Sequence, residues 1–183
     1  MGQETDPVRR FSLESALPIP LAETLALEIG MGEASALGQA WLLPPSLAIR
    51  VNRMRTTPER LSVRLEEEGV RSRPSAFHPD ALLLEGLSSP VGKLPSFREG
   101  EWTVQGEGAM MAARILSPEP RQRVLDLCAA PGGKTGHLAE LASDRGTILA
   151  ADRSPERLRL VADQAGRLGL SSISLRLMDA SAP

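Results

Sequence analysis

The sequence predicts an α/β protein in which short N-terminal helices and a small α+β unit precede half of a doubly wound parallel sheet. Three observations predict this fold. Residues 124–178 read as strand, helix, strand, helix, strand, and right-handed crossovers place three such strands side by side in the order three-two-one. A glycine-containing turn, residues 129–133, joins the first of these strands to its helix. Upstream, residues 47–85 read as strand, helix, strand.

Residues 1–43 are expected to form a tail and two short helices. Residues 1–11 are predicted to be a loose tail. Beyond them, apolar residues recur with helical spacing, and two glycines divide the run into helices at 22–29 and 33–41. Pro44 and Pro45 end the second helix and mark a domain boundary.

Residues 44–100 are expected to form the small α+β unit. Residues 47–52 (LAIRVN) alternate as a strand, and a helix capped at Thr57 runs to about Glu68. Residues 81–85 are predicted to be a second strand. Residues 90–100, rich in turn formers, are predicted to connect this unit to the next.

Residues 101–183 are expected to form the partial parallel sheet with its helices. The elements predicted here are a strand at 101–105, a helix at 108–116, a buried strand at 124–127, a helix at 134–142, a strand at 147–151, a helix at 155–168 and a strand at 173–178. The second long helix ends at a glycine, which is the usual C-terminal stop.

The turn after the first parallel strand is a candidate ligand site. Glycines let a ligand approach the backbone, and the free N–H groups that begin the next helix offer donors. A Walker A phosphate loop needs a glycine where this chain has Cys128, and the turn also lacks the dinucleotide spacing G-x-G-x-x-G. Two interpretations remain: a Rossmann-type nucleoside site with a different turn, or a plain strand-to-helix connection.

Asp152 favours the nucleoside interpretation. It follows the second parallel strand, about 20 positions after the glycine turn, where this architecture places the acid that binds ribose hydroxyls. Ser154, Pro155 and Glu156 already supply the cap, the first-turn proline and the acid of the next helix. Capping therefore does not require Asp152, and we expect it to bind ligand.

The string CAAPGGKT after the first strand, Asp152 after the second and Asp179 after the third resemble the bacterial ribosomal RNA cytosine-C5 methyltransferases of the Sun (Fmu) family, related to the Nol/Nop/Sun enzymes. The resemblance covers about residues 44–183. It implies a Rossmann-like class I methyltransferase domain at 101–183, an RNA-recognition-like domain at 44–100, and S-adenosyl-L-methionine as cofactor. Asp152 would take the ribose and Asp179 would lie beside the adenine. The other cofactor-binding residues that it implies are Cys128, Ala129, Ala130, Pro131, Gly132, Gly133 and Lys134, here called the cofactor loop.

By the same resemblance, a cysteine thiolate adds to C6 of cytosine so that C5 can attack the methyl group. The family carries this cysteine, a second cysteine used in release and an acid that contacts the base on strands four and five, which would follow Pro183. We therefore expect no catalytic residue in this chain, and we expect the chain alone to be inactive. The chain is expected to be either a fragment of a longer enzyme or one part of a split protein, whose separately encoded C-terminal half would supply the missing strands. The alternative is a non-catalytic RNA- or cofactor-binding module.

Composition narrows the remaining classes of function. Cys128 is the single cysteine, which excludes an internal disulfide, and we expect it to line the cofactor site rather than to act as the nucleophile. His78 and His137 stand far apart and without CxxC, so no metal site is predicted. Because neither a membrane span nor a signal peptide is recognisable, we expect a cytoplasmic protein without a membrane partner.

The arginine distribution favours RNA as a partner, although the net charge of −2 is a mild argument against nucleic-acid binding. Arginines cluster between residues 50 and 73, and guanidinium groups pair with phosphates and stack on bases. The predicted RNA-binding residues are Arg50, Arg53 and Arg55, and the family resemblance implies ribosomal RNA. Arg60 and Arg64 fit a solvated helix face equally well.

Overall fold

The structure is a computed structural model that describes residues 4–43, 46–87 and 89–181. The chain forms two compact units, of which the first ends at Pro45 and the second begins at Ser46. The boundary predicted at Pro44 and Pro45 lies outside the described residues, and the division between the units falls at this point of the chain. In the described ranges, no helix is long and apolar enough to cross a membrane.

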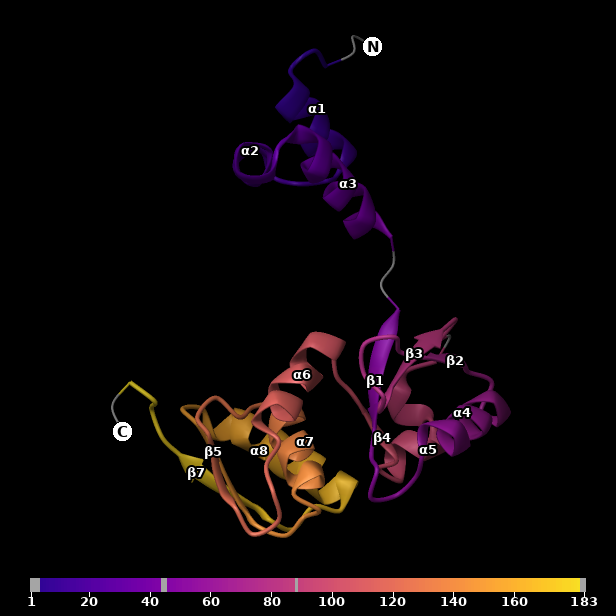
Figure 1. Ribbon diagram of the computed structural model, residues 1–183, viewed down its shortest axis with the longest axis vertical. Coiled ribbons are helices and arrows are strands. Elements are labelled where there is room, and N and C mark those ends of the chain that lie inside the picture. The colour runs from indigo at the N-terminus through magenta and orange to yellow at the C-terminus, as the bar shows by residue number, and fades with distance from the viewer. Residues whose placement is uncertain (1–3, 44–45, 88, 182–183) are drawn as a thin grey trace. The chain divides into compact units, whose positions relative to one another are not determined.

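The first unit is a cluster of three helices: α1 (Pro7–Glu14), α2 (Ile19–Ile29) and α3 (Met31–Leu42) (Figure 1). Their contacts centre on Phe11, Ala22 and Ala34, which are buried. The prediction of a loose tail through residue 11 was wrong, because α1 begins at Pro7. The Asp6 carboxylate caps this helix by accepting a hydrogen bond of 2.8 Å from the Val8 N–H. The other two helices are confirmed with slightly longer bounds.

The second unit begins with a four-stranded antiparallel sheet, here called sheet A. Its elements are β1 (Leu47–Val51), α4 (Pro58–Glu67), β2 (Arg71–Pro74), β3 (Ala81–Glu85), η1 (Val91–Lys93), α5 (Pro95–Arg98) and β4 (Trp102–Val104). The strand order is β2-β3-β1-β4, with α4 connecting β1 to β2. This order and connectivity are those of a ferredoxin-like fold.

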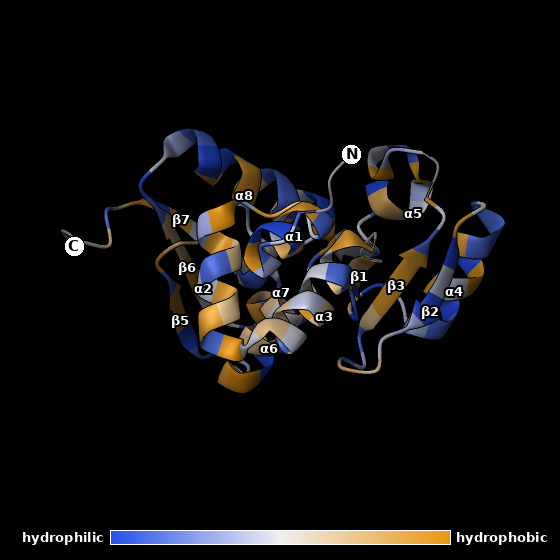
Figure 2. Ribbon diagram, turned by 90° about the horizontal axis from the view of Figure 1, so that it is seen from above, coloured by the Kyte–Doolittle hydropathy of each residue, from blue (hydrophilic) through white to orange (hydrophobic). Residues whose placement is uncertain are grey.

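Sheet A buries one face against α4. Ile49 and Leu82 on neighbouring strands pack with Leu61 and Leu65 of the helix, and Trp102 completes this core. Figure 2 shows β3 as a continuous hydrophobic strand. Because side chains alternate along a strand, the residue after Ile49, which is Arg50, leaves β1 on the opposite face.

Three features of sheet A differ from the sequence predictions. Strand β2 was not predicted, and the connector at 90–100 contains η1 and α5. The sequence assigns the strand at 101–105 to the same part of the chain as the partial parallel sheet, but β4 pairs with β1, for example Thr103 with Arg50. Backbone pairing to a distant strand therefore decides where β4 belongs, and order along the chain does not.

The rest of the second unit is a parallel three-stranded sheet, here called sheet B. Its elements are α6 (Glu107–Leu116), β5 (Arg123–Asp126), α7 (Gly133–Leu141), β6 (Thr147–Asp152), α8 (Pro155–Leu168) and β7 (Ile173–Leu177). The strand order β5-β6-β7 confirms the predicted arrangement with the second strand in the centre. One face is buried: Ile148 of β6 packs with Val124, Ile173 and Leu138 of α7.

The first strand of sheet B lies at an edge of the sheet and is partly exposed. The buried strand predicted at 124–127 assumes a complete sheet; in sheet B, β5 lies at the edge, and its side chains alternate between exposed and half-buried. Leu125 is 52% exposed and Leu127 is 40% exposed. Leu125 pairs in register with Leu149 of β6, on the face opposite the helices' core. Sheet B therefore presents apolar surface along this edge and face.

Candidate functional site

The cofactor loop follows β5 and is fixed by short backbone hydrogen bonds. Ala129 donates its N–H to the Ala151 carbonyl at 2.9 Å, and Gly132 donates to the Ala129 carbonyl at 2.7 Å. The Ala130–Pro131 peptide bond is cis. These contacts join the loop to the end of β6, so that the sequence segment predicted to bind cofactor lies beside the strand that carries Asp152.

Gly132 shapes the loop rather than lining it. Its φ of +105° is favourable for glycine only, and a Cβ atom there would lie 3.2 Å from the Val161 Cα of α8. The next residue, Gly133, begins α7, and no side chain caps this helix. The N–H groups of the first turn of α7, at the edge of the loop, are therefore without a capping side chain. These N–H groups form the positive end of the helix dipole, which favours negatively charged groups nearby.

Asp152 is 4% exposed and holds the loop from the end of β6. Its Oδ2 accepts a hydrogen bond of 3.3 Å from the Ala130 N–H, and its Oδ1 accepts one of 3.1 Å from the Ser154 N–H. The Ser154 N–H is the main reason that the pKa of Asp152 lies below its ordinary value, and the Ala130 N–H acts in the same direction. The carboxylate is therefore charged at neutral pH and keeps lone pairs for a ligand.

Three predicted residues meet in one cleft of about 290 Å³. Cys128, Asp152 and Asp179 come from the carboxyl ends of β5, β6 and β7 and line this cleft, here called the acidic cleft. In open α/β sheets, ligands bind at this end of the strands. Arg153 and Arg157 also line the cleft.

A second cleft, of about 210 Å³, lies along the other side of the cofactor loop. It is lined by Val104, Gln105, Ala109, Cys128, Ala129, Ala130, Pro131, Gly133 and Lys134. Cys128 borders both clefts and is exposed, so it is not the buried thiol that a single cysteine usually is. Of the nine residues predicted to bind cofactor, only Gly132 lines neither cleft.

Asp179 is exposed at the rim of the acidic cleft. It accepts hydrogen bonds from the Ser181 hydroxyl at 2.7 Å and from the Ser181 N–H at 2.9 Å. These contacts lower the pKa of the Asp179 carboxyl, which is therefore ionised at neutral pH. No contact ties Asp179 to the cofactor loop among the described residues, so this side chain is available to a ligand.

The structure separates the three arginines predicted to bind RNA. Arg50 is 1% exposed and forms an ion pair of 2.6 Å with Glu140, so its guanidinium is not accessible to a phosphate and its prediction was wrong. Arg53 is exposed and lies 3.4 Å from Asp80. Arg55 is exposed and donates to the Leu168 carbonyl at 3.0 Å. Arg53 and Arg55 remain predicted RNA-binding residues.

An exposed aromatic residue was missed by the sequence analysis. Phe77 is 78% exposed in the loop between β2 and β3. The Ser75 hydroxyl oxygen orders this loop by accepting hydrogen bonds from the N–H groups of Phe77 and His78. The available signal was the short Pro-Ser segment before Phe77, which is typical of a turn. Over the ranges that the structure covers, no cluster of three or more His, Cys, Asp or Glu residues is arranged to hold a metal ion.

Family models match both parts of the second unit. Residues 113–183 match the family described as 16S rRNA methyltransferase RsmB/F, and residues 21–90 match the ferredoxin-like domain of the RsmF/B-like methyltransferases. The chain belongs to the RsmB/F family. The match to the ferredoxin-like domain extends into α2 and α3, which the sequence pattern had assigned to a separate N-terminal segment.

RsmB/F relatives resemble the chain over most of its length. The probable ribosomal RNA small subunit methyltransferase B of Synechocystis sp. is 38% identical over 92% of this chain and 38% of its own length. The protein of the same name from Bacillus subtilis is 35% identical over 96% of this chain and 39% of its own length. The chain therefore spans about two fifths of the length of these RsmB/F relatives.

Solved structures agree with the RsmB/F fold. The crystal structure of PH0851 is 30% identical, with a TM-score of 0.90 over 98% of this chain and 40% of that one. A methyltransferase homologue from Pyrococcus horikoshii is 25% identical, with a TM-score of 0.83 over 97% of this chain and 58% of that one. NSun6 from P. horikoshii, solved with SFG, has a TM-score of 0.82 at 23% identity, over 92% of this chain and 67% of that one.

Proposed function

We propose that this chain supplies the S-adenosylmethionine site and the RNA-facing domain of an enzyme that methylates C5 of cytosine in 16S ribosomal RNA. The observation that carries the proposal is the convergence of Cys128, Asp152 and Asp179 in the acidic cleft at the carboxyl ends of three parallel strands. Membership of the RsmB/F family supports the reaction class, and the relatives are named as ribosomal RNA methyltransferases.

The residues of the two clefts fit this cofactor. The Asp152 carboxylate, already held by two N–H groups, can accept hydrogen bonds from ribose hydroxyls. Asp179 can accept one from the adenine amino group. The second cleft offers Lys134 and the start of α7 to the amino-acid carboxylate. The acidic cleft also contains Arg153 and Arg157, and Arg157 lies 4.0 Å from Asp152, so its two acids act as hydrogen-bond acceptors in a cleft of balanced charge. When bound, S-adenosylmethionine supplies an electrophilic methyl group.

Calorimetric titration of S-adenosylmethionine tests the cofactor site. Asp179→Ala should raise Kd about tenfold, because a hydrogen bond to a charged group is worth roughly 1.5–3 kcal/mol. Asp179 is the sharper test because Asp152 also holds the loop, so an Asp152 variant combines two effects. Asp163→Ala is the matched control, since Asp163 is an exposed acid of α8 away from both clefts. Equal affinities for wild type and Asp179→Ala would contradict the site.

Cys128 is not the nucleophile in this proposal. It lines the cofactor clefts, and the family's cysteine would come from strands four and five, which follow the parallel strands present here. We therefore expect Cys128→Ser to keep the affinity for S-adenosylmethionine. We also expect the chain alone to transfer no methyl group from radiolabelled S-adenosylmethionine to 16S ribosomal RNA. Transfer by the wild-type chain that is lost in Cys128→Ser would overturn this assignment.

RNA binding is proposed for three exposed residues, Arg53, Arg55 and Phe77. Two exposed guanidinium groups and an exposed ring provide phosphate contacts and a base-stacking surface. Phe77→Ala should weaken binding of single-stranded ribosomal RNA segments about fivefold or more, and Phe77→Trp should preserve it, since stacking is worth roughly 1–3 kcal/mol. Equal affinity of Phe77→Ala and wild type in a fluorescence anisotropy titration would remove Phe77 from the interface.

A non-catalytic RNA- or cofactor-binding module is the second candidate function. The specific observation in its favour is that Cys128, the single cysteine of the chain, lines the acidic cleft and the second cleft, where the proposed cofactor binds. The coding sequence after the Pro183 codon distinguishes the candidates. An in-frame or frameshifted Pro-Cys and Thr-Cys pair, or a separately encoded protein that carries it and packs on the apolar edge at Leu125, favours the enzyme. Unrelated sequence with no such protein favours the module.

A further inference from the structure

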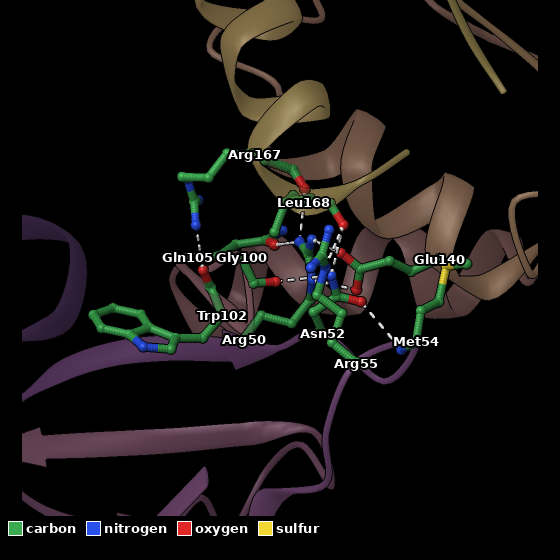
Figure 3. A network of polar contacts seen from close by, with 11 residues as sticks. Arg50, Asn52, Met54, Arg55, Gly100, Trp102, Gln105, Glu140, Arg167 and Leu168 are labelled. Carbon is green, nitrogen blue, oxygen red and sulfur yellow. Dashed lines mark hydrogen bonds and ion pairs between the residues drawn. The ribbon is translucent and has the colours of Figure 1, made fainter. Parts of the chain in front are cut away.

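Arg50 connects sheet A to the cofactor loop through a buried polar network (Figure 3). Its side chain leaves β1 on the face opposite the apolar core of sheet A and is 1% exposed. All of its hydrogen-bond acceptors lie outside its own strand, on Gln105, Gly133 and Glu140. Two of these residues, Gly133 and Glu140, belong to α7, whose first residues are the last residues of the cofactor loop.

The guanidinium holds α7 at two points along one face. Nη1 donates to the Gly133 carbonyl at 2.8 Å, at the start of the helix. Nε and Nη2 donate to the two carboxylate oxygens of Glu140 at 3.1 and 2.6 Å. Gly133 and Glu140 are seven residues apart, which is about two helical turns of 3.6 residues. The planar, fork-shaped donor set of arginine therefore fixes both the position and the rotation of α7 relative to β1.

Arg50 also fixes the wall of the second cleft. Its Nη1 donates to Gln105 Oε1, and because a guanidinium carries donors only, this contact determines the orientation of the Gln105 carboxamide. Gln105 lines the second cleft together with Gly133. Its Cδ lies 3.8 Å from the position that a Cβ on Gly133 would occupy, so Gln105 lies beside the start of α7.

We propose that Arg50 is a positioning residue for cofactor binding, which sets the geometry of Gly133 and Gln105 from the ferredoxin-like sheet. This inference rests on the proposed S-adenosylmethionine site. Stability alone does not require the arginine, because a buried ion pair can often be replaced by apolar side chains of similar size without loss. A guanidinium that contacts Gly133, Gln105 and Glu140 at once is needed only if the relative positions of the cofactor loop, the second cleft and α7 matter.

The test compares three variants of the full chain. Arg50→Lys keeps the charge beside Glu140 but cannot contact Glu140, Gln105 and the Gly133 carbonyl together. Arg50→Met/Glu140→Leu removes both charges, which avoids an unpaired buried carboxylate. The matched control is Arg167→Met. Arg167 also joins the two sheets, donating to the Phe97 and Trp102 carbonyls at 2.7 and 2.9 Å, but it does not contact the cofactor loop.

Two measurements separate positioning from support of the fold. Titration calorimetry should show Kd for S-adenosylmethionine raised about tenfold in both Arg50 variants and within about twofold of wild type in Arg167→Met. Hydrogen exchange in the free chain should show faster exchange of the amides of residues 132–136 in the Arg50 variants only. A thermal unfolding curve for each variant identifies any that do not fold.

Each outcome bears on a separate statement. Unchanged Kd and unchanged exchange in the two Arg50 variants would overturn the positioning role. An equal loss of affinity in Arg167→Met would also overturn it, because general support between the sheets would then explain the effect. If the wild-type chain binds no S-adenosylmethionine, the proposed cofactor site fails, and the exchange of residues 132–136 still tests whether Arg50 positions the loop.

Discussion

Sheet A and sheet B differ in how completely each covers its own apolar residues. In sheet A, all four apolar residues of β3, Ala81 to Leu84, are buried, and α4 closes the core. In sheet B, Leu125 of β5 and Leu177 of β7 are more than half exposed. The two sheets share one compact unit, yet only sheet A has the closed core of an independent domain. Sheet B therefore leaves apolar residues of both of its edge strands exposed.

The contacts between sheet A and sheet B are mainly polar and buried. Asn52, which follows β1, donates to the carbonyls of Gly100 and Leu168 at 2.9 and 3.0 Å. Arg50 donates to the Glu140 carboxylate of α7 at 2.6 Å. Such groups are costly when one partner is removed, because the remaining one stays buried without a hydrogen bond. The position of α7, which begins at the cofactor loop, therefore depends on buried polar contacts with sheet A as well as on the apolar core of sheet B.

The largest effect is expected in the core of sheet A. Leu82 is fully buried among Ile49, Leu61 and Leu65, so Leu82→Ala should lower the free energy of unfolding by about 3 kcal/mol through lost burial and a residual cavity. Urea denaturation followed by circular dichroism measures this value. A loss below about 1 kcal/mol would contradict the closed core that distinguishes sheet A.

An intermediate effect is expected at the connection between the sheets. His137 of α7 is buried beside His78, with ring centroids 5.5 Å apart. Burial lowers the pKa of His137 to about 3, and the positive charge of Arg50 acts in the same direction. Between about pH 6.5 and 3, the unfolded chain binds a proton that the native protein does not. The stability that neutral His137 provides is therefore lost as the pH falls from 6.5.

Urea denaturation at pH 7.5 and at pH 5 measures this dependence. The slope approaches 1.4 kcal/mol per pH unit below pH 6.5, so wild type should lose roughly 2 kcal/mol between pH 7.5 and 5 through His137. His137→Gln should lose less over the same interval. His78, whose pKa burial also lowers, is present in both proteins, so their difference isolates His137. Parallel pH profiles for the two proteins would show that His137 is not held neutral.

The smallest effect is expected at the edge of sheet B. Leu125→Ala makes the same chemical change as Leu82→Ala, but Leu125 is 52% exposed on an edge strand. The free energy of unfolding should change by no more than about 0.5 kcal/mol. Binding of a hydrophobic dye should decrease, because the exposed apolar surface is smaller. A loss comparable to that of Leu82→Ala would mean that β5 is covered in solution, for example by a second copy.

Local chemistry explains which elements the sequence predicts well. The end of β5, the glycine turn and the start of α7 depend on neighbouring residues, and Gly132 has the positive φ that its position requires. Helix α8 was predicted with its observed bounds because Ser154 caps it and Gly169 ends it. The meeting of Cys128, Asp152 and Asp179 followed from the parallel order of their strands.

Features that depend on distant partners were not predictable in this way. Strand β2 reads RSRP and lacks an apolar alternation, and it is a strand because it pairs with β3. Arg50 looked like its exposed neighbours because its partner, Glu140, lies 90 positions away in the sequence. Helix α1 is a different case, since Asp6 and Pro7 form a recognisable helix start that the sequence analysis overlooked.

The end of α8 has a consequence for protein engineering. The Leu168 carbonyl accepts hydrogen bonds from Asn52 and Arg55, which belong to the segment after β1. The C-terminus of α8 is therefore capped by side chains of the part of the chain that forms sheet A. A chimera that grafts α8 and β7 onto an unrelated first domain would leave this carbonyl without those donors. Exchange of these domains between homologues should therefore succeed only when the new first domain has an amide and a guanidinium that reach the Leu168 carbonyl.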